Sequence, residues 1–492
     1  MKQTKWGHVG TVLLVGAALA SAGCQDTSKG GTTSGPGGGA VETFEPKGCA
    51  FKVGVRAEYL EATSGKLDVG ATPNIRRVRL GLGGNVAVGA AGRADPSTTA
   101  GFAWQTDEGT FASEVAWGSA PDPSSWPAEN RTGGFTWKTP AGTINASGDE
   151  RMHEAYVCGL KPGTTYYYRV GGGAAGKEAW SDVYAFTTTP SDPATEVTFV
   201  VSGDSRGQQN DAWRLLQERV LAKGVNLQLF SGDMINLAPD QGEWERWLDA
   251  AWKDDSNNPL TLGQLLTLSA HGNHDNHTSL YFGNLVLPQD VATFPDYGEL
   301  FFSVDVGPVH VVVVDDAFIV SPQGDTNYAG VLTDWLKADL KAANDRRKDV
   351  PWIVAMHHHP EYSSSLHGKD ADVLRGRAFF GPLWDEFHVD LVLAGHDHDY
   401  ERSKPLTGPT DNPTVKSSFK DGTVYLVTAG AGADAYSAGT STFTETSRDF
   451  KSGGAFGFYS YIKATKATLT IESHELRGDG TDPAFDTVAI TP

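Results

Sequence analysis

The sequence predicts two folded domains, an N-terminal β-sandwich followed by a layered α/β domain. Two observations support this prediction. Short alternating segments separated by Gly, Pro, Asn and Asp run from residue 50 to residue 190, as in a sandwich of short strands. From residue 195 to residue 492, short apolar runs alternate with helical patterns, which is typical of a layered α/β domain. A length of 492 residues, of which 39% are hydrophobic, leaves room for more than one core.

Three segments of the first region have the alternation of β-strands, at 102–106, 113–117 and 154–158. The segment 160–170 places a turn-forming Pro-Gly before alternating aromatic residues, as at the corner of a sandwich where a tyrosine hydroxyl bonds back to the backbone. With Trp180 and the strand-like end at 186–187, this region resembles a fibronectin type III domain. We expect residues 191–195 to link it to the second region.

Five short apolar runs in the second region predict buried strands, at 197–201, 226–230, 265–268, 352–356 and 389–393. Apolar residues at helical spacing predict an amphipathic helix over 331–343. Trp244, Trp247 and Trp252 are nearly helically spaced, and we interpret them as core residues or as the rim of a cleft. None of the three is assigned a chemical role.

The chain begins with a basic stretch, an apolar run over 9–22 and then Gly23-Cys24. This predicts a signal peptide over 1–24, with an apolar run too short to span a bilayer comfortably. The small residues before Cys24 resemble a bacterial lipoprotein box, and residues 25–45 have the composition of a flexible Gly/Ser/Thr tether. We therefore expect a lipid anchor on Cys24 in the bacterial cell envelope. The alternative is a secretory signal cut elsewhere, and both place the protein outside the cytoplasm.

The two remaining cysteines are Cys49 and Cys158. In an oxidising compartment such a pair favours a disulfide bond. Two buried free thiols are an equally good interpretation, because the sequence does not set the distance between the two residues.

The charge balance restricts the partners of the protein. There are 40 basic and 60 acidic residues, which give a formal net charge of −20, and no run of Lys and Arg is present. This balance repels phosphate backbones and argues against nucleic acid as a partner. A small phosphate ester held by metal ions remains compatible with it.

Metal-type ligands follow each of the five apolar runs, and eleven of the 14 histidines lie between residues 271 and 398. The carboxyl ends of strands in open α/β sheets meet at a crevice, and a glycine before most of the ligands allows a sharp turn. Carboxylate, amide and imidazole donors together suit first-row metals better than Ca²⁺ or Mg²⁺ alone. The five motifs are Gly203-Asp204, Gly232-Asp233, Gly272-Asn273-His274, His358 in a His-x-Pro-x-Tyr frame, and Gly395-His396-Asp397-His398.

These motifs, in this order, resemble the calcineurin-like metallophosphoesterase superfamily, and within it the purple acid phosphatases. The blocks at 351–358, 395–402 and 422–428 are similar to that branch, and the resemblance covers roughly residues 75–490. It implies a four-layered α/β catalytic domain with two divalent or mixed-valence metal ions, of Fe, Zn or Mn. It also implies hydrolysis of phosphate monoesters by a metal-activated hydroxide.

Carried over by position, the resemblance implies two sets of metal ligands. Asp204 and His398 would hold the first ion, and Asp233 would bridge the two ions. Purple acid phosphatases place a tyrosinate that binds ferric iron in the second block, where this chain has Asn236, so Asn236 or a water would complete the first set. The second set would consist of Asn273, His358 and His396.

Three further residues are candidates for the reaction. His274 matches a family position that contacts the phosphate, and His367 matches one that protonates the leaving group. Arg206 could bind phosphate oxygens as a fork. The alternatives are a loop histidine for His367 and a surface ion pair for Arg206. We expect His357 and His359 to lie outside the ligand sets, at the surface or in a supporting position.

A phosphate monoesterase is the function that these observations favour. A phosphodiesterase or nucleotidase is the first alternative, since the ligands do not select between ester classes. A cell-surface binding module with a decayed site is the second, although all six best-specified ligands are present.

Overall fold

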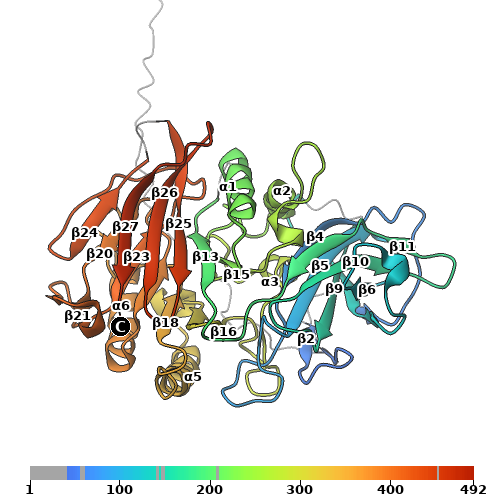
Figure 1. The fold of residues 1–492 in the computed structure, drawn as a ribbon, viewed down its shortest axis with the longest axis horizontal. Coiled ribbons are helices and arrows are strands. Elements are labelled where there is room, and N and C mark those ends of the chain that lie inside the picture. Colours follow the sequence, from blue (N-terminus) through green and yellow to red (C-terminus); the bar gives the residue numbers. More distant parts are fainter. Residues whose placement is uncertain are drawn as a thin grey trace, which may run out of the picture. The chain divides into compact units, whose positions relative to one another are not determined.

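The computed structural model describes residues 42–55, 61–139, 143–145, 150–206, 210–450 and 454–491. It confirms the predicted fold class, a sheet-rich N-terminal domain followed by a mixed α/β domain (Figure 1). The predicted signal peptide, Cys24 and nearly all of the predicted tether lie outside the described residues. Within the described part, no helix combines the length and the apolar character that a membrane span requires.

The N-terminal domain is built from two five-stranded sheets, which contain all three strands predicted for it. One sheet has the order β3-β8-β9-β5-β4, and the other has β11-β10-β6-β7 with β12 paired to β10. A short hairpin of β1 (Glu42–Phe44) and β2 (Val53–Val55) precedes them. The strands are β3 (Thr63–Ser64), β4 (Arg76–Gly81), β5 (Thr99–Asp107), β6 (Glu114–Gly118), β7 (Arg131–Gly133), β8 (Phe135–Lys138), β9 (Glu150–Cys158), β10 (Thr165–Gly172), β11 (Ala179–Trp180) and β12 (Tyr184–Thr187).

A disulfide bond joins Cys49 to Cys158, the last residue of β9, with the two Cα atoms 5.3 Å apart. The bond covalently links the segment between β1 and β2 to the β-sandwich. Of the two interpretations that the sequence left open, the structure has the bridge.

The α/β domain contains a six-stranded sheet, β15-β14-β13-β25-β26-β27, and a seven-stranded sheet, β16-β17-β18-β19-β23-β20-β24. In Figure 1 the late strands β25 to β27 lie beside β13. The strands are β13 (Val197–Ser202), β14 (Leu227–Phe230), β15 (Thr267–Ser269), β16 (Phe301–Val306), β17 (Val309–Val314), β18 (Trp352–Met356), β19 (Leu391–Ala394), β20 (Tyr400–Ser403), β23 (Val424–Thr428), β24 (Thr444–Arg448), β25 (Ala455–Ala464), β26 (Leu469–Arg477) and β27 (Ala484–Ile490), with a separate hairpin of β21 (Leu406–Thr407) and β22 (Thr414–Val415).

The helices accompany these sheets. They are α1 (Asn210–Lys223), α2 (Gln241–Trp252), α3 (Ser279–Asn284), α4 (Ala317–Val320), α5 (Thr326–Asn344) and α6 (Ala371–Phe387). The helix predicted over 331–343 is the greater part of α5, and its apolar face, including Trp335 and Leu336, is buried. Trp244 and Trp247 of α2 are buried in the core, as interpreted from their spacing.

The five predicted strands all form, and they divide between the two sheets. β13, β14 and β15 are parallel neighbours in one sheet, and β18 and β19 are parallel neighbours in the other. β17, β18 and β19 are buried along their whole length, which explains why they appear in the sequence as continuous apolar runs. The third strand begins later than predicted, at Thr267, because the N–H of Leu265 bonds to the carbonyl of Thr261 and continues a helical turn.

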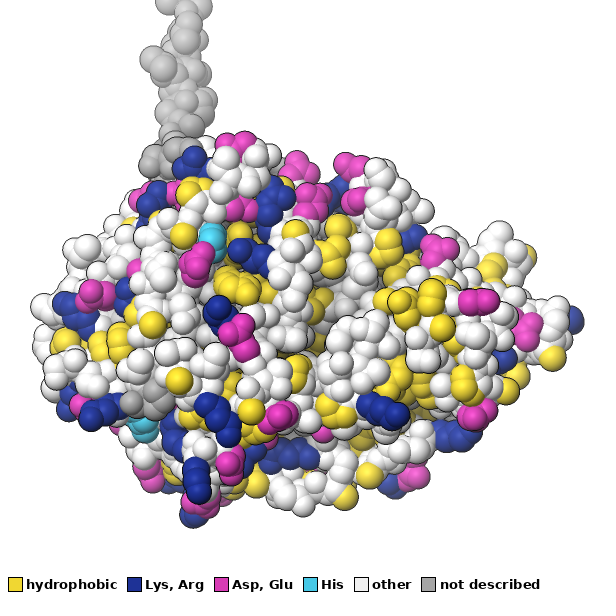
Figure 2. Space-filling view, in the orientation of Figure 1, with side chains coloured by type: hydrophobic (Ala, Val, Ile, Leu, Met, Phe, Trp, Pro, Cys, Tyr) yellow, Lys and Arg dark blue, Asp and Glu magenta, His cyan; other side chains and the backbone are white. Residues whose placement is uncertain are grey.

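Acidic and basic side chains are interspersed on the face drawn in Figure 2, without a broad patch of either charge. Hardly any histidine reaches this face. Several of the histidines counted in the sequence are buried, and five of them follow closely after β15, β18 or β19: His271, His357, His358, His359 and His398.

Candidate metal centre

Three predicted ligands have a left-handed backbone close behind the ends of strands. Asp204, Asp233 and His396 have φ angles of 60°, 59° and 71°. Such values are uncommon outside glycine, and they often occur where a functional site constrains the chain. A glycine precedes each residue, and a Cβ at Gly395 would collide with the carboxylate of Asp204. The glycines are therefore required for the close approach of the loops, while the ligand residues themselves make the turn.

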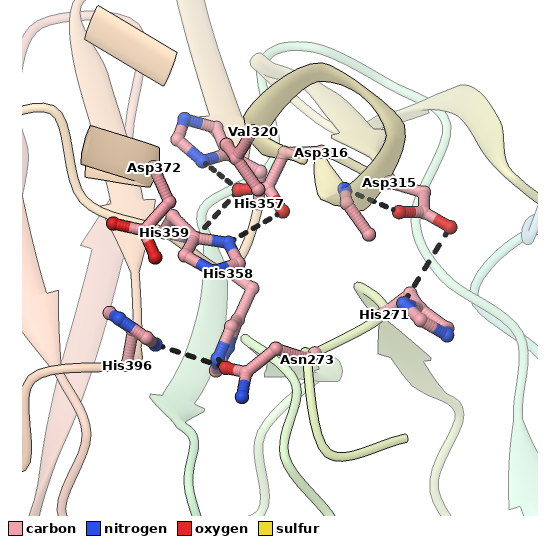
Figure 3. A network of polar contacts seen from close by, with 12 residues as sticks. His271, Asn273, Asp315, Asp316, Val320, His357, His358, His359, Asp372 and His396 are labelled. Atoms are coloured by element: carbon pink, nitrogen blue, oxygen red, sulfur yellow. Dashed lines mark hydrogen bonds and ion pairs between the residues drawn. The ribbon is translucent and has the colours of Figure 1, made fainter. Parts of the chain in front are cut away.

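The predicted second set meets around the side-chain oxygen of Asn273 (Figure 3). Oδ1 of Asn273 lies 3.0 Å from Nε2 of His358 and 3.0 Å from Nδ1 of His396. The other ring nitrogen of His358 lies 2.8 Å from the carbonyl oxygen of Ser231, and Oδ1 of Asp233 lies 3.4 Å from Nε2 of His358. A His358 ring that donates to Ser231 presents the lone pair of Nε2 to the site. These donors suit a first-row metal ion.

The protonation states of this group also suit metal binding. Burial, followed by the neighbouring charge of His359, lowers the pKa of His396 well below its ordinary value, so the imidazole is neutral. Burial by itself raises the pKa of Asp233, but the positive charges around it, that of His358 foremost, outweigh this effect and lower the pKa. A neutral imidazole and an ionised carboxylate are the forms that bind metals.

The predicted first set brings Asp204 and His398 close to Asp233. Nε2 of His398 lies 3.5 Å from Oδ1 of Asp204, and its Nδ1 lies 2.7 Å from the carbonyl oxygen of Asp434. Asp204, Asp233 and His358 each offer one donor atom, and these three atoms lie within 4.8 Å of one another. Asp233 is thus in contact with both sets, as a bridging ligand requires.

The guanidinium of Arg206 lies within the first set. Its Nε is 3.1 Å from Oδ2 of Asp233, one terminal nitrogen donates to Oδ1 of Asn236 at 3.2 Å, and the other is 3.3 Å from Nε2 of His398. The side chain is 18% exposed, and its ion pair is with the buried carboxylate of Asp233. The predicted ligands of the first ion surround a positive charge that belongs to the chain itself.

His274 and His367 each lie beside a predicted ligand, Asn236 and His396 respectively. Nδ1 of His274 is 2.9 Å from the carbonyl oxygen of Asn236. The His367 ring lies 4.7 Å from that of His396, and its Nδ1 is 2.8 Å from the carboxylate of Asp370. His367 is therefore beside the predicted ligands, and its loop is held toward them.

Asp275, which no sequence motif marked as a candidate, supports the site. Its carboxylate accepts hydrogen bonds from the backbone N–H groups of Asp233, Met234 and Gly272 at 2.9, 3.0 and 2.9 Å. Burial and the adjacent charge of Asp233 raise the pKa of Asp275 well above its ordinary range. The sequence feature that could have indicated a role for Asp275 is its position at the end of the Gly-Asn-His-Asp motif, directly after the candidates Asn273 and His274.

His357 and His359 are buried, so a surface position for either is wrong. The carboxylate of Asp316 lies between them, 3.2 Å from Nδ1 of His357 and 2.9 Å from Nδ1 of His359 (Figure 3). Nε2 of His357 is 3.0 Å from Glu361, on the side away from the centre. His357 therefore has a supporting position. His359 shares the carboxylate of Asp316 with it, and one donor atom of His359 also lies within 4.8 Å of donor atoms of Asp372 and His396.

Two families match this chain. Residues 87–188 match the N-terminal domain of purple acid phosphatases, and residues 197–400 match the calcineurin-like phosphoesterases. Purple acid phosphatase 21 of Arabidopsis thaliana is 28% identical over 273 residues, which are 54% of this chain and 56% of that protein. An uncharacterized protein of Mycobacterium tuberculosis is 32% identical over 230 residues, which are 42% of this chain and 41% of that protein. The chain thus spans about half the length of these relatives.

A similar fold is known from a solved structure. The purple acid phosphatase PPD1 from yellow lupin (Lupinus luteus) seeds superposes with a TM-score of 0.62, covering 90% of this chain and 81% of that chain. The two sequences are 16% identical, so the likeness concerns the fold.

Proposed function

We propose that this chain, which belongs to the calcineurin-like phosphoesterases and carries the N-terminal domain of purple acid phosphatases, hydrolyses phosphate monoesters at a centre of two metal ions. The observation that carries the proposal is the convergence of carboxylate, amide and imidazole donors at the ends of strands from both sheets. Asp233 makes a paired site possible, because its donor atom lies within 4.8 Å of those of Asp204 in the first set and His358 in the second.

Different residues would bind the metal ions, bind the phosphate and transfer the proton. The second set would hold one ion and the first set the other, with Asp233 shared between them. Bound metal ions of the Fe, Zn or Mn type would supply Lewis acidity at the phosphoryl group and lower the pKa of the attacking water. His274 is placed to bind a phosphate oxygen, and His367 to give a proton to the leaving oxygen.

Arg206 can pair either with the carboxylate of Asp233 or with the phosphate oxygens of a bound ester. In the structure its guanidinium neutralises Asp233 at the position proposed for the first ion. With an ion there, Asp233 is satisfied by the metal, and the fork is free to bind phosphate oxygens. The Arg206→Gln variant should therefore bind the first ion more tightly and show a higher KM for the ester. Titration of metal content together with steady-state kinetics measures both effects. A weaker first site in this variant would contradict the assignment.

The central test is elemental analysis combined with a panel of esters. The wild-type protein should bind two equivalents of metal and hydrolyse an aryl phosphate monoester faster than the corresponding diester. Asn273→Ala should lose one equivalent, while the exposed turn variant Asn412→Ala should keep both. Faster diester hydrolysis would favour a phosphodiesterase or nucleotidase. Absence of both metal and hydrolysis would favour a binding module.

We also propose that the protein is exported and held in the cell envelope by a lipid on Cys24. The support is the basic start, the short apolar run and the tether that follows. Cys24→Ala should move the protein from the membrane fraction to the soluble fraction without loss of ester hydrolysis. Equal partitioning of the variant and the wild-type protein would contradict the anchor.

A further inference from the structure

A second cluster of ligand-type residues lies beside the proposed centre but outside both of its sets. His271 comes shortly after β15, His277 lies six residues later, and Asp315 directly follows β17. One donor atom from each of the three lies within 4.8 Å of the other two. Nδ1 of His271 is 3.6 Å from Oδ2 of Asp315, and a dashed line marks this contact in Figure 3. Nε2 of His277 is 2.5 Å from the same oxygen.

His271 is the residue that needs an explanation. The side chain is 2% exposed, and neither ring nitrogen has a hydrogen-bond partner among the described residues. A buried polar group without a partner costs about 1–3 kcal/mol. The surrounding rings supply none, because the edge of Tyr281 packs on one side and the ring of His277 stacks on the other.

The geometry points to a further metal site formed by His271, His277 and Asp315, which would bind Zn²⁺ or another first-row divalent ion separately from the two-ion centre. Two imidazole nitrogens and a carboxylate oxygen form a known set of zinc ligands, with a water in the fourth position. Two ligands on one Zn²⁺ lie roughly 3.4 Å apart in a tetrahedral arrangement, close to the separation of His271 from Asp315.

The orientation of Asp315 agrees with this assignment. The remaining oxygen of Asp315, Oδ1, accepts the N–H of Ala317 at 2.9 Å, which orients the carboxylate toward the two histidines.

His277 is the ligand that moves when the ion binds. Its ring is now stacked on that of His271, with ring centres 4.1 Å apart, whereas an ion lies in the plane of each imidazole that binds it. The His277 side chain is 16% exposed against 2% for the other two, and its other face stacks on Phe318 with ring centres 4.1 Å apart. Binding of the ion therefore requires the ring to rotate out of both stacks. The ion then takes the place of the proton between His277 and Asp315.

An ion at this site would restrain the segment 271–277, which carries two residues of the proposed centre, Asn273 and His274. His271 and His277 stand on either side of Asn273 and His274 in the sequence, and Asp315 directly follows β17, a strand of the other sheet. Binding to the folded state alone stabilises the protein by mass action. The expected role of this ion is to hold the loop in place.

The test measures zinc in full-length protein whose two-ion centre has been disabled. In an Asp233→Ala, Asn273→Ala background, about one equivalent of Zn²⁺ should remain, and adding His277→Gln should remove it. The control His388→Gln changes another histidine near a carboxylate and should keep the equivalent. Chelation should lower the Tm of the background protein and leave that of the His277→Gln protein unchanged.

Two results would overturn the inference: no zinc in the background protein, or the same zinc content with and without His277. The second measurement is Co²⁺ substitution, which should give a tetrahedral absorption spectrum that is lost with His277→Gln. The background lacks Asp233, the shared ligand, and Asn273 of the second set. The comparison with and without His277→Gln is made within this one background, so failure of the proposed function would not change its outcome. His277 is partly exposed, so its variant is expected to fold even where His271→Gln does not.

Discussion

The carboxylate of Asp275 accepts N–H groups from two different loops, that of Asp233 and that of Gly272. It touches no proposed substrate position, and its effect is to set the separation of two ligand-bearing turns. An amide at this place offers only one acceptor oxygen and repels one N–H group. We expect Asp275→Asn to lower metal affinity by about 10–100-fold while the protein stays folded. Metal titration, with circular dichroism as the folding control, measures this, and unchanged affinity would contradict it.

Asn236 provides a spectroscopic prediction. Its side chain accepts a hydrogen bond from Arg206 and has no phenolate to donate charge to ferric iron. Tyr362 and Tyr400 are both buried, and their hydroxyls donate to Gly408 and Asp486. We therefore expect the iron-loaded protein to lack a strong visible band. Asn236→Tyr is the complementary variant, and a purple wild-type protein would contradict the ligand assignment of the first set.

At the scale of the elements, the sequence predicts where strands end better than which groups meet across the fold. Each apolar run stops at a ligand motif, so the positions of Asp204 and His358 follow from local pattern. Asp316 and Asp275 were not predicted to hold distant partners, because hydrogen bonds between loops have no local signal. The position of Arg206 depends on packing in the same way, since its guanidinium contacts Asp233 and Asn236 of one loop and His398 of another.

A charged network on β17 gives a pH dependence of stability. Burial lowers the pKa of His310, but the charges of Asp339 and Asp305 and hydrogen bonds to them outweigh this and raise the pKa to about 9. Arg93 and Arg346 pair with the same two carboxylates. The folded state thus holds the proton more tightly than the unfolded state, whose histidine pKa is about 6.5. The stabilisation, on the order of 3 kcal/mol, is complete below pH 6.5 and is lost as the pH rises through 9.

Urea unfolding of wild-type and His310→Gln protein measures this contribution. The wild-type protein should be more stable than the variant at pH 6, and the difference should shrink by pH 9.5. His388→Gln, a substitution at a partly exposed histidine, serves as the control and should leave the pH profile close to that of the wild type. A difference that stays constant across this range would contradict the assignment.

At the scale of the whole molecule, the Cys49–Cys158 bond closes a long loop, with a sequence separation of 109 residues. Loops of this length restrict the unfolded chain strongly, and loss of such a bond typically costs about 2–4 kcal/mol. Reduction should therefore lower the Tm of the N-terminal domain. The Cys49→Ala, Cys158→Ala double variant should have the lower Tm from the start and respond to reductant no further. Equal Tm values with and without reductant in the wild-type protein would contradict this.

The pairing of β13 with β25 also sets the order in which the protein can mature during synthesis. Asp204 follows shortly after the end of β13. One of the two strands that pair with β13 is β25, which begins only at Ala455. A ribosome that has made every proposed ligand, up to His398, still holds a chain whose ligand-bearing sheet lacks β25 to β27. The nascent polypeptide therefore emerges with its histidines on an incomplete scaffold. Acquisition of metal by the finished centre becomes a late event, after the last strands have been released.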